Sequence, residues 1–218
     1  GFQVAGPKAA EVLQRCTATD VSKIKFLDVM EVNVGDTACL LQQVSYTGGH
    51  GFELYCDPMA QRSLWDTLWT AGRPDGITPF GMRAMMSLRL DRFFGSWMAE
   101  FSPDYTAAET GLDRFISFKK NTNFIGRAAA EAERATPPER QLVAFEVEAS
   151  DADVVAYEPV FIDGEVQGFC TSGGYSHHAE KSIAFALVPR DKAMVDLEVE
   201  IEILGQRCIA RRIIEPLI

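Results

Sequence analysis

Apolar and polar residues alternate in short runs through the first quarter of the chain, a period that predicts β-strands. Gly35-Asp36 lies between two of these runs and is typical of a tight hairpin turn. We therefore expect strands connected by hairpins near the N-terminus. The predicted strands cover residues 2–4, 30–34, 37–41 with an extension to 46, and 52–56.

Three other segments place apolar residues at helical spacing. They cover residues 8–15, 59–71 and 79–92. The second segment is the clearest, because Asp57 is a good N-cap and Pro58 fits a first helical turn. Its apolar stripe consists of Leu64, Trp65, Leu68 and Trp69. Strands joined to helices at this spacing indicate a mixed α+β domain.

The pattern changes after residues 131–140, which are polar and contain Pro137-Pro138. We place a domain boundary there, between residues 135 and 136. Short strands separated by turn signals follow the boundary, and their succession predicts a small β-barrel or sandwich. These strands cover residues 142–147, 158–162, 166–171, 183–187, 197–203 and 208–213.

Charge and composition exclude several classes of protein. The 218 residues carry a net charge of −10, and no basic cluster is large enough for nucleic acid. No run approaches the roughly 20 apolar residues of a membrane span. The five cysteines are spread singly, which is typical of free thiols in a reducing cytoplasm. We therefore expect a cytoplasmic protein with no nucleic-acid or membrane partner.

Candidate chemistry begins at the glycine-rich turn that joins the strands near residue 50. Tyr46 and Glu53 flank this turn, which contains Gly48, Gly49 and Gly51. Glycines let a ligand approach the backbone, and a carboxylate can accept two hydrogen bonds from adjacent N–H donors of a flat heterocycle. The alternative from these residues alone is a plain hairpin with a structural tyrosine.

Other kinds of site lack support in the sequence. His177 and His178 are adjacent and would point apart on a strand, and no carboxylate cluster has the spacing of metal ligands. No Gly-x-Gly-x-x-Gly follows a predicted strand, so no dinucleotide fingerprint is present. We expect no metal site and name no catalytic residue.

The run Tyr-Thr-Gly-x-x-Gly-Phe-Glu, which ends at Glu53, resembles the signature of the glycine-cleavage aminomethyltransferase family. In that family the Tyr and the final Glu contact the pterin of tetrahydrofolate, which implies the same role for Tyr46 and Glu53. The family usually has Glu at the position of Gly49.

A second segment, residues 81–91, resembles the family's Gly-x-x-Ala-Arg-Asp-x-Leu-Arg-Leu-Glu helix. Met85 stands where glycine-cleavage members have a ligand-binding Arg, whereas the amine-oxidising branch has an apolar residue there. The resemblance makes Arg83 and Arg89 further folate contacts. The alternative for both is a helix-surface or structural ion pair.

Three later runs resemble sarcosine and dimethylglycine dehydrogenases, so the resemblance covers essentially the whole chain. These runs lie at residues 102–112, 124–127 and 158–177. The resemblance implies an α+β fold with a partial aminomethyltransferase folate-binding domain at 1–135. A small C-terminal β-barrel is expected at 136–218.

Complete family members begin with about a hundred further residues, the size of a small domain, which carry a catalytic Asp. The chain starts without Met, and we expect it to be cut from a longer protein and inactive alone. The implied cofactor is tetrahydrofolate, with FAD only in a domain outside this chain. The implied partners are a methylamine-derived one-carbon unit and a flavin domain or subunit.

The leading hypothesis is the tetrahydrofolate-binding, one-carbon (methylene or aminomethyl) transfer region of an N-methylamine oxidoreductase of the sarcosine or dimethylglycine type. A second is a stand-alone aminomethyltransferase or folate-dependent demethylase. A third is a non-catalytic folate-binding module.

Overall fold

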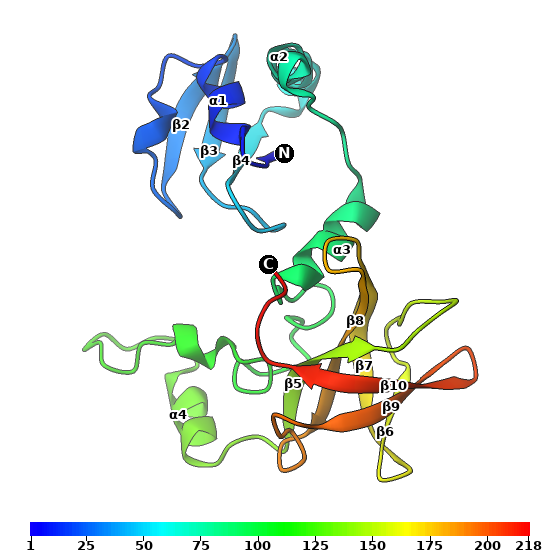
Figure 1. Ribbon diagram of the computed structural model, residues 1–218. Coiled ribbons are helices and arrows are strands. Elements are labelled where there is room, and N and C mark those ends of the chain that lie inside the picture. The colour runs from blue at the N-terminus through cyan, green and yellow to red at the C-terminus, as the bar shows by residue number, and fades with distance from the viewer. The chain divides into compact units, whose positions relative to one another are not determined.

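The computed structural model describes residues 1–218, which divide into two compact units. Unit 1 is Gly1–Met85 and unit 2 is Met86–Ile218 (Figure 1). Unit 1 combines a sheet with helices, and unit 2 contains a closed β-barrel. The predicted α+β class with a C-terminal barrel is confirmed. The domain boundary predicted after residue 135 stays a prediction.

Unit 1 contains a four-stranded antiparallel sheet in the order β1-β4-β3-β2. Its strands are β1 (Phe2–Ala5), β2 (Val29–Val34), β3 (Thr37–Gln42) and β4 (Gly51–Cys56). The predicted extension of β3 to residue 46 is wrong. β3 ends at Gln42, opposite Val29 where β2 begins, because the chain just before β2 turns at Leu27, whose φ is 69°.

Two helices, α1 (Ala9–Gln14) and α2 (Gln61–Gly72), supply the apolar side chains that pack on one face of this sheet. Asp57 accepts a hydrogen bond from the backbone N–H of Met59, as predicted for a cap, but the first turn is a 3-10 helix, η2 (Pro58–Ala60). The core shared by sheet and helices includes Leu13, Leu41, Phe52, Leu54, Leu64 and Leu68. Two more short 3-10 helices of unit 1 are η1 (Val21–Lys23) and η3 (Arg73–Asp75).

The division between the units falls inside helix α3 (Met82–Asp91). Unit 2 continues with η4 (Leu112–Phe115) and α4 (Arg127–Ala135) before its strands begin. Helix α4 was not predicted, because no apolar stripe marks it and none of its residues is buried. None of the helices is both long and apolar enough to cross a lipid bilayer.

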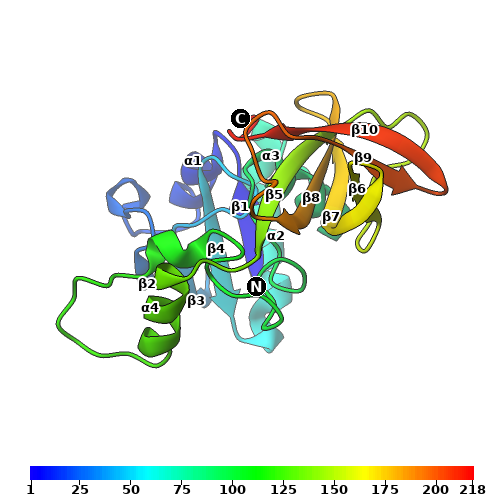
Figure 2. The same cartoon turned by 90° about the horizontal axis from the view of Figure 1, so that it is seen from below.

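The barrel of unit 2 closes through six strands in the order β10-β5-β8-β7-β6-β9 (Figure 2). The strands are β5 (Arg140–Val147), β6 (Pro159–Ile162), β7 (Glu165–Ser176), β8 (Lys181–Pro189), β9 (Glu198–Ile203) and β10 (Gln206–Ile213). All six predicted strands are confirmed. Left-handed residues at Asp163-Gly164 and Leu204-Gly205 make the two tight hairpin turns that the sequence indicated.

Candidate functional site

A polar row crosses the face of the unit 1 sheet that lies opposite its helices. Glu53 on β4 is the cross-strand partner of both Gln3 on β1 and Gln42 on β3. Its neighbours Phe52 and Leu54 point into the core, so alternation along the strand sends Glu53 to the other face. We call Gln3, Glu53 and Gln42 the polar row. It brings a carboxylate between two amide side chains, at cross-strand contact distance.

Tyr55 shares this face and interacts with the predicted ligand carboxylate. Its hydroxyl donates a hydrogen bond to Oε2 of Glu53, and this bond raises the pKa of Tyr55 above its usual value. Tyr55 is about half exposed, and Glu53 is partly buried. Sequence reasoning missed Tyr55, although its position two residues after Glu53 on a strand would have placed both on one face.

The glycine turn packs tightly against the polar row through Ser45. Gln3 Nε2 donates to Ser45 Oγ at 3.3 Å, and Ser45 Oγ donates to the carbonyl of Gly48 at 3.0 Å. A Cβ on Gly51 would lie 2.6 Å from the Cβ of Ser45, so only glycine fits there. At Gly49, by contrast, a Cβ would meet nothing within 4 Å. The turn is therefore closely packed at Gly51, next to the sheet, and free of neighbouring atoms at Gly49.

Tyr46 lies in the loop after β3 that precedes this turn, and Glu53 lies on β4, which follows it. Tyr46 is partly buried and directly follows Ser45, while Glu53 lies two residues after Gly51. Their assignment as pterin contacts stays a prediction.

An apolar pocket of about 330 Å³ lies along β1 within unit 1. Trp65 and Trp69 of α2 stack in its wall, with ring centroids 5.9 Å apart and planes 7° from parallel. Gln3 of the edge strand β1 is among the lining residues, and its side chain bonds to Ser45 Oγ. Met85, the residue that replaces the family's Arg, is part of the lining. A cavity of this size and character is typical of small-ligand sites.

Arg83, in the first turn of α3, has an exposed side chain. It follows Met82, which lines the apolar pocket. Its folate contact stays a prediction.

Arg89 lies in unit 2 in quite different surroundings. Its side chain is 1% exposed and forms an ion pair with the fully buried Glu100, with Nη1 and Oε2 3.2 Å apart. The same Nη1 donates to the carbonyl of Phe94 at 2.9 Å, and the guanidinium lies over the ring of Phe185. Its folate contact stays a prediction, and these contacts favour the alternative of a structural ion pair.

Glu100 was missed by sequence reasoning, yet it joins two of the recognised motifs. It accepts hydrogen bonds from the backbone N–H of Ser96 at 2.6 Å, from the Thr171 hydroxyl at 2.6 Å and from the Ser172 hydroxyl. Thr171 and Ser172 lie on β7, within the family-like run at residues 158–177. We call Arg89, Ser96, Glu100, Thr171 and Ser172 the Glu100 network.

Two other recognised motifs also have structural contacts. Thr106 and Glu109 exchange reciprocal side-chain to backbone hydrogen bonds, the pattern of a capping box. Arg127, after the left-handed Gly126, donates to the carbonyls of Phe118 and Lys120, both at 3.1 Å. These residues close loops of unit 2. No group of three or more His, Cys, Asp or Glu in the chain could hold a metal ion.

Comparisons with known proteins support the resemblance along the whole chain. Residues 1–120 match the family model of the GCVT N-terminal domain, and residues 140–218 match that of the glycine cleavage T-protein C-terminal barrel domain. A crystal structure of glycine cleavage system aminomethyltransferase T from Bartonella henselae shares the fold, with a TM-score of 0.76 at 17% identity. That likeness covers 99% of this chain and 83% of the other.

Among curated relatives, human mitochondrial dimethylglycine dehydrogenase is 38% identical over 99% of this chain and 25% of its own length. An aminomethyltransferase of Geobacillus sp. (strain WCH70) is 34% identical over 97% of this chain and 58% of its own length. The chain thus spans about a quarter of the dehydrogenase and somewhat over half of the aminomethyltransferase. The chain matches the models of both the N-terminal domain and the C-terminal barrel domain of the glycine cleavage T-protein family. It therefore belongs to that family.

Proposed function

We propose that this chain is the tetrahydrofolate-binding, one-carbon transfer region of an N-methylamine oxidoreductase that acts on sarcosine- or dimethylglycine-type amines. The observation that carries the proposal is the Glu53 carboxylate, held between two amides beside a glycine turn that is open on one side. Such a carboxylate suits a flat heterocycle with adjacent N–H donors. The dehydrogenase relatives and the apolar Met85 favour the amine-oxidising branch.

The residues present fit a pterin ligand. Glu53 and Tyr46 would hold and orient the heterocycle. Arg83 would contact a carboxylate of the ligand, whereas we assign Arg89 a structural role. Bound tetrahydrofolate supplies the amine nitrogens that accept a one-carbon unit. The amine substrate and FAD would belong to a flavin domain or subunit outside this chain.

A second candidate is a stand-alone aminomethyltransferase, which the 34% identical Geobacillus relative favours. The two candidates differ in what precedes the region in the gene. A flavin-binding Gly-x-Gly-x-x-Gly upstream of Gly1 would support the oxidoreductase, and its absence from the complete gene would support the transferase. Under either candidate we propose a reducing, cytoplasmic location, consistent with five free cysteines.

Calorimetry with tetrahydrofolate under anaerobic conditions tests the proposal on this chain. Glu53→Gln keeps the size of the side chain but removes the charge, and we expect affinity to fall about tenfold or more, the value of a hydrogen bond to a charged group. The matched control is Glu31→Gln, because Glu31 is an exposed carboxylate on the same face of the same sheet. Equal affinity in both variants would contradict the role of Glu53, and no binding by the unaltered chain would contradict folate binding by this region.

A further inference from the structure

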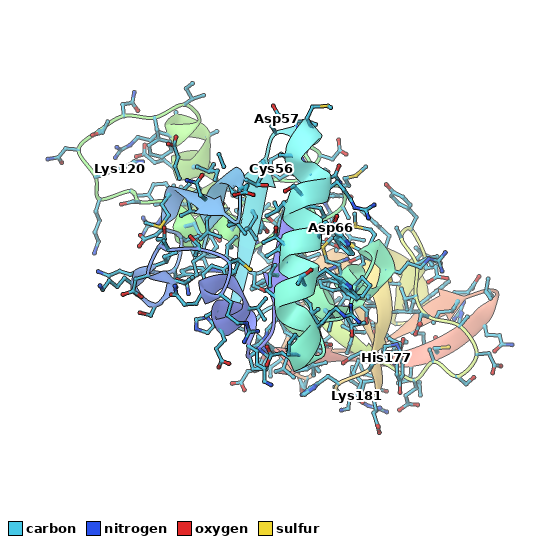
Figure 3. All side chains as sticks on the ribbon, turned by 90° about the horizontal axis from the view of Figure 1, so that it is seen from above. Cys56, Asp57, Asp66, Lys120, His177 and Lys181 are labelled. Atoms are coloured by element: carbon cyan, nitrogen blue, oxygen red, sulfur yellow. The ribbon has the colours of Figure 1, made fainter.

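Two of the five cysteines face each other directly across neighbouring strands. The register of the β3–β4 pair places Cys39 opposite Cys56. Cross-strand partners point to the same face, and both cysteines contribute to the helix-side core of unit 1. Cys39 is buried, whereas Cys56 is partly exposed at the end of β4, next to Asp57 where the chain turns into η2 (Figure 3).

Directly opposed residues of an antiparallel pair have Cα atoms about 4.5 to 5.5 Å apart. Disulfides have Cα separations of about 4.4 to 6.8 Å, so directly opposed residues lie within the range that a disulfide spans. The other cysteines lack such a partner. Cys170 and Cys208 lie in unit 2, and Cys16 in unit 1 directs its thiol to the carbonyls of Val12 and Thr67.

We propose that Cys39 and Cys56 form a dithiol site that a peroxide oxidises to a cross-strand disulfide. This proposal is independent of folate binding. Cys56 reacts first because it is the accessible member of the pair, and burial raises the pKa of the Cys39 thiol.

The chemistry balances with one molecule of hydrogen peroxide. The Cys56 thiolate attacks a peroxide oxygen, the O–O bond breaks, and a sulfenic acid and hydroxide result. The Cys39 thiolate then attacks the Cys56 sulfur, the S–O bond breaks, and a second hydroxide leaves as the S–S bond forms. Two thiols lose two electrons and two protons, and peroxide becomes two waters.

The disulfide would close the hairpin that carries the glycine turn. The turn joins β3 to β4 at one end, and Cys39 with Cys56 lies at the opposite end of the paired strands. Glu53 lies inside the closed loop of residues 39–56. Oxidation would therefore restrict fraying of β4 next to Glu53, and a thiol reductant would reverse it.

Peptide mapping of the folded protein tests this proposal. The sequence contains no Lys or Arg between Lys25 and Arg62, so trypsin leaves both cysteines in one peptide, 26–62. After brief peroxide treatment, unfolding and alkylation, we expect this peptide to carry no alkyl group and to be two hydrogens lighter. Cleavage after Glu53 should leave two pieces joined until a reductant separates them. A doubly alkylated peptide 26–62 would overturn the proposal.

Two variants provide controls. In Cys56→Ser the remaining Cys39 should stay alkylatable, while Cys208→Ser should form the disulfide as the unaltered protein does. Near-ultraviolet circular dichroism before oxidation verifies that each variant is folded. If Cys56→Ser is not folded, reversal by dithiothreitol in the unaltered protein serves as the second readout. Linkage of either cysteine to Cys16 instead would also overturn the proposal.

Discussion

Two carboxylates, Glu53 in unit 1 and Glu100 in unit 2, lie in contrasting surroundings. Glu53 is partly exposed on a sheet face, where Tyr55 donates to one of its oxygens. Glu100 is fully buried, pairs with Arg89, and receives hydrogen bonds from one backbone N–H and two hydroxyls. Glu53 lies within a family motif, and Glu100 contacts residues of two others.

The contrast indicates which motif residues face a ligand and which hold the fold. A buried charge whose oxygens are all engaged has no capacity for a ligand, and its loss leaves a partner uncompensated. A partly exposed carboxylate beside an open turn can exchange a surface hydrogen bond for one to a ligand at little cost to stability. Position in a recognised motif therefore does not by itself make a residue such as Arg89 part of a binding site.

The largest expected effect comes from breaking the buried ion pair. Arg89→Met should lower the free energy of unfolding by about 3 to 5 kcal/mol, because it leaves Glu100 buried without its cation. Urea denaturation measures this change. Arg83→Met, an exposed position on the same helix, should change stability by no more than about 0.5 kcal/mol. Similar losses of stability in the two variants would contradict the structural role that we assign to Arg89 alone.

A smaller effect is expected where the glycine turn packs on the sheet. Gly51→Ala should cost about 1 to 3 kcal/mol of stability, because the new Cβ would lie 2.6 Å from that of Ser45. Gly81→Ala is the matched control, since a Cβ there meets nothing within 4 Å. If thermal unfolding shows equal stability for both variants, the close contact between turn and sheet is incorrect.

The smallest effect concerns the pH dependence of the Glu53–Tyr55 pair. The folded pKa of Tyr55 is raised above its usual value, chiefly by its hydrogen bond to Glu53. Its contribution to stability is therefore fully present below the unfolded pKa and is lost as pH rises through the folded pKa. Absorbance titration at alkaline pH should show one tyrosine whose ionisation shifts downward in Glu53→Gln and disappears in Tyr55→Phe. An unchanged titration in Glu53→Gln would mean that the pair does not form.

Much of the fold follows from local pattern. Alternation located β4 and the barrel strands, and the cap at Asp57 located the 3-10 turn that leads into α2, the chain's longest helix. The extension of β3 failed because its partner β2 begins only at Val29, opposite Gln42, after the left-handed Leu27, and alternation does not report where a partner strand begins. Helix α4 was missed because it lacks a buried face.

The candidate site was only half predictable for a different reason. Tyr46 and Glu53 lie in one continuous motif, so sequence resemblance could locate both. Gln3 and Gln42 lie beside Glu53 only because three strands pair in this register. The sequence of any single strand does not determine that register. Glu100 likewise contacts β7 across some 70 residues of chain.

Paired measurements on Glu53→Gln and Glu100→Gln test the central claim, that the two carboxylates divide ligand binding and stability between them. Calorimetry gives the affinity for tetrahydrofolate, and urea unfolding gives stability. We expect Glu53→Gln to lose affinity about tenfold or more with stability within about 0.5 kcal/mol. Glu100→Gln should lose about 3 kcal/mol or more of stability while the folded fraction keeps its affinity. Loss of affinity in Glu100→Gln alone, with Glu53→Gln unaffected, would contradict the account.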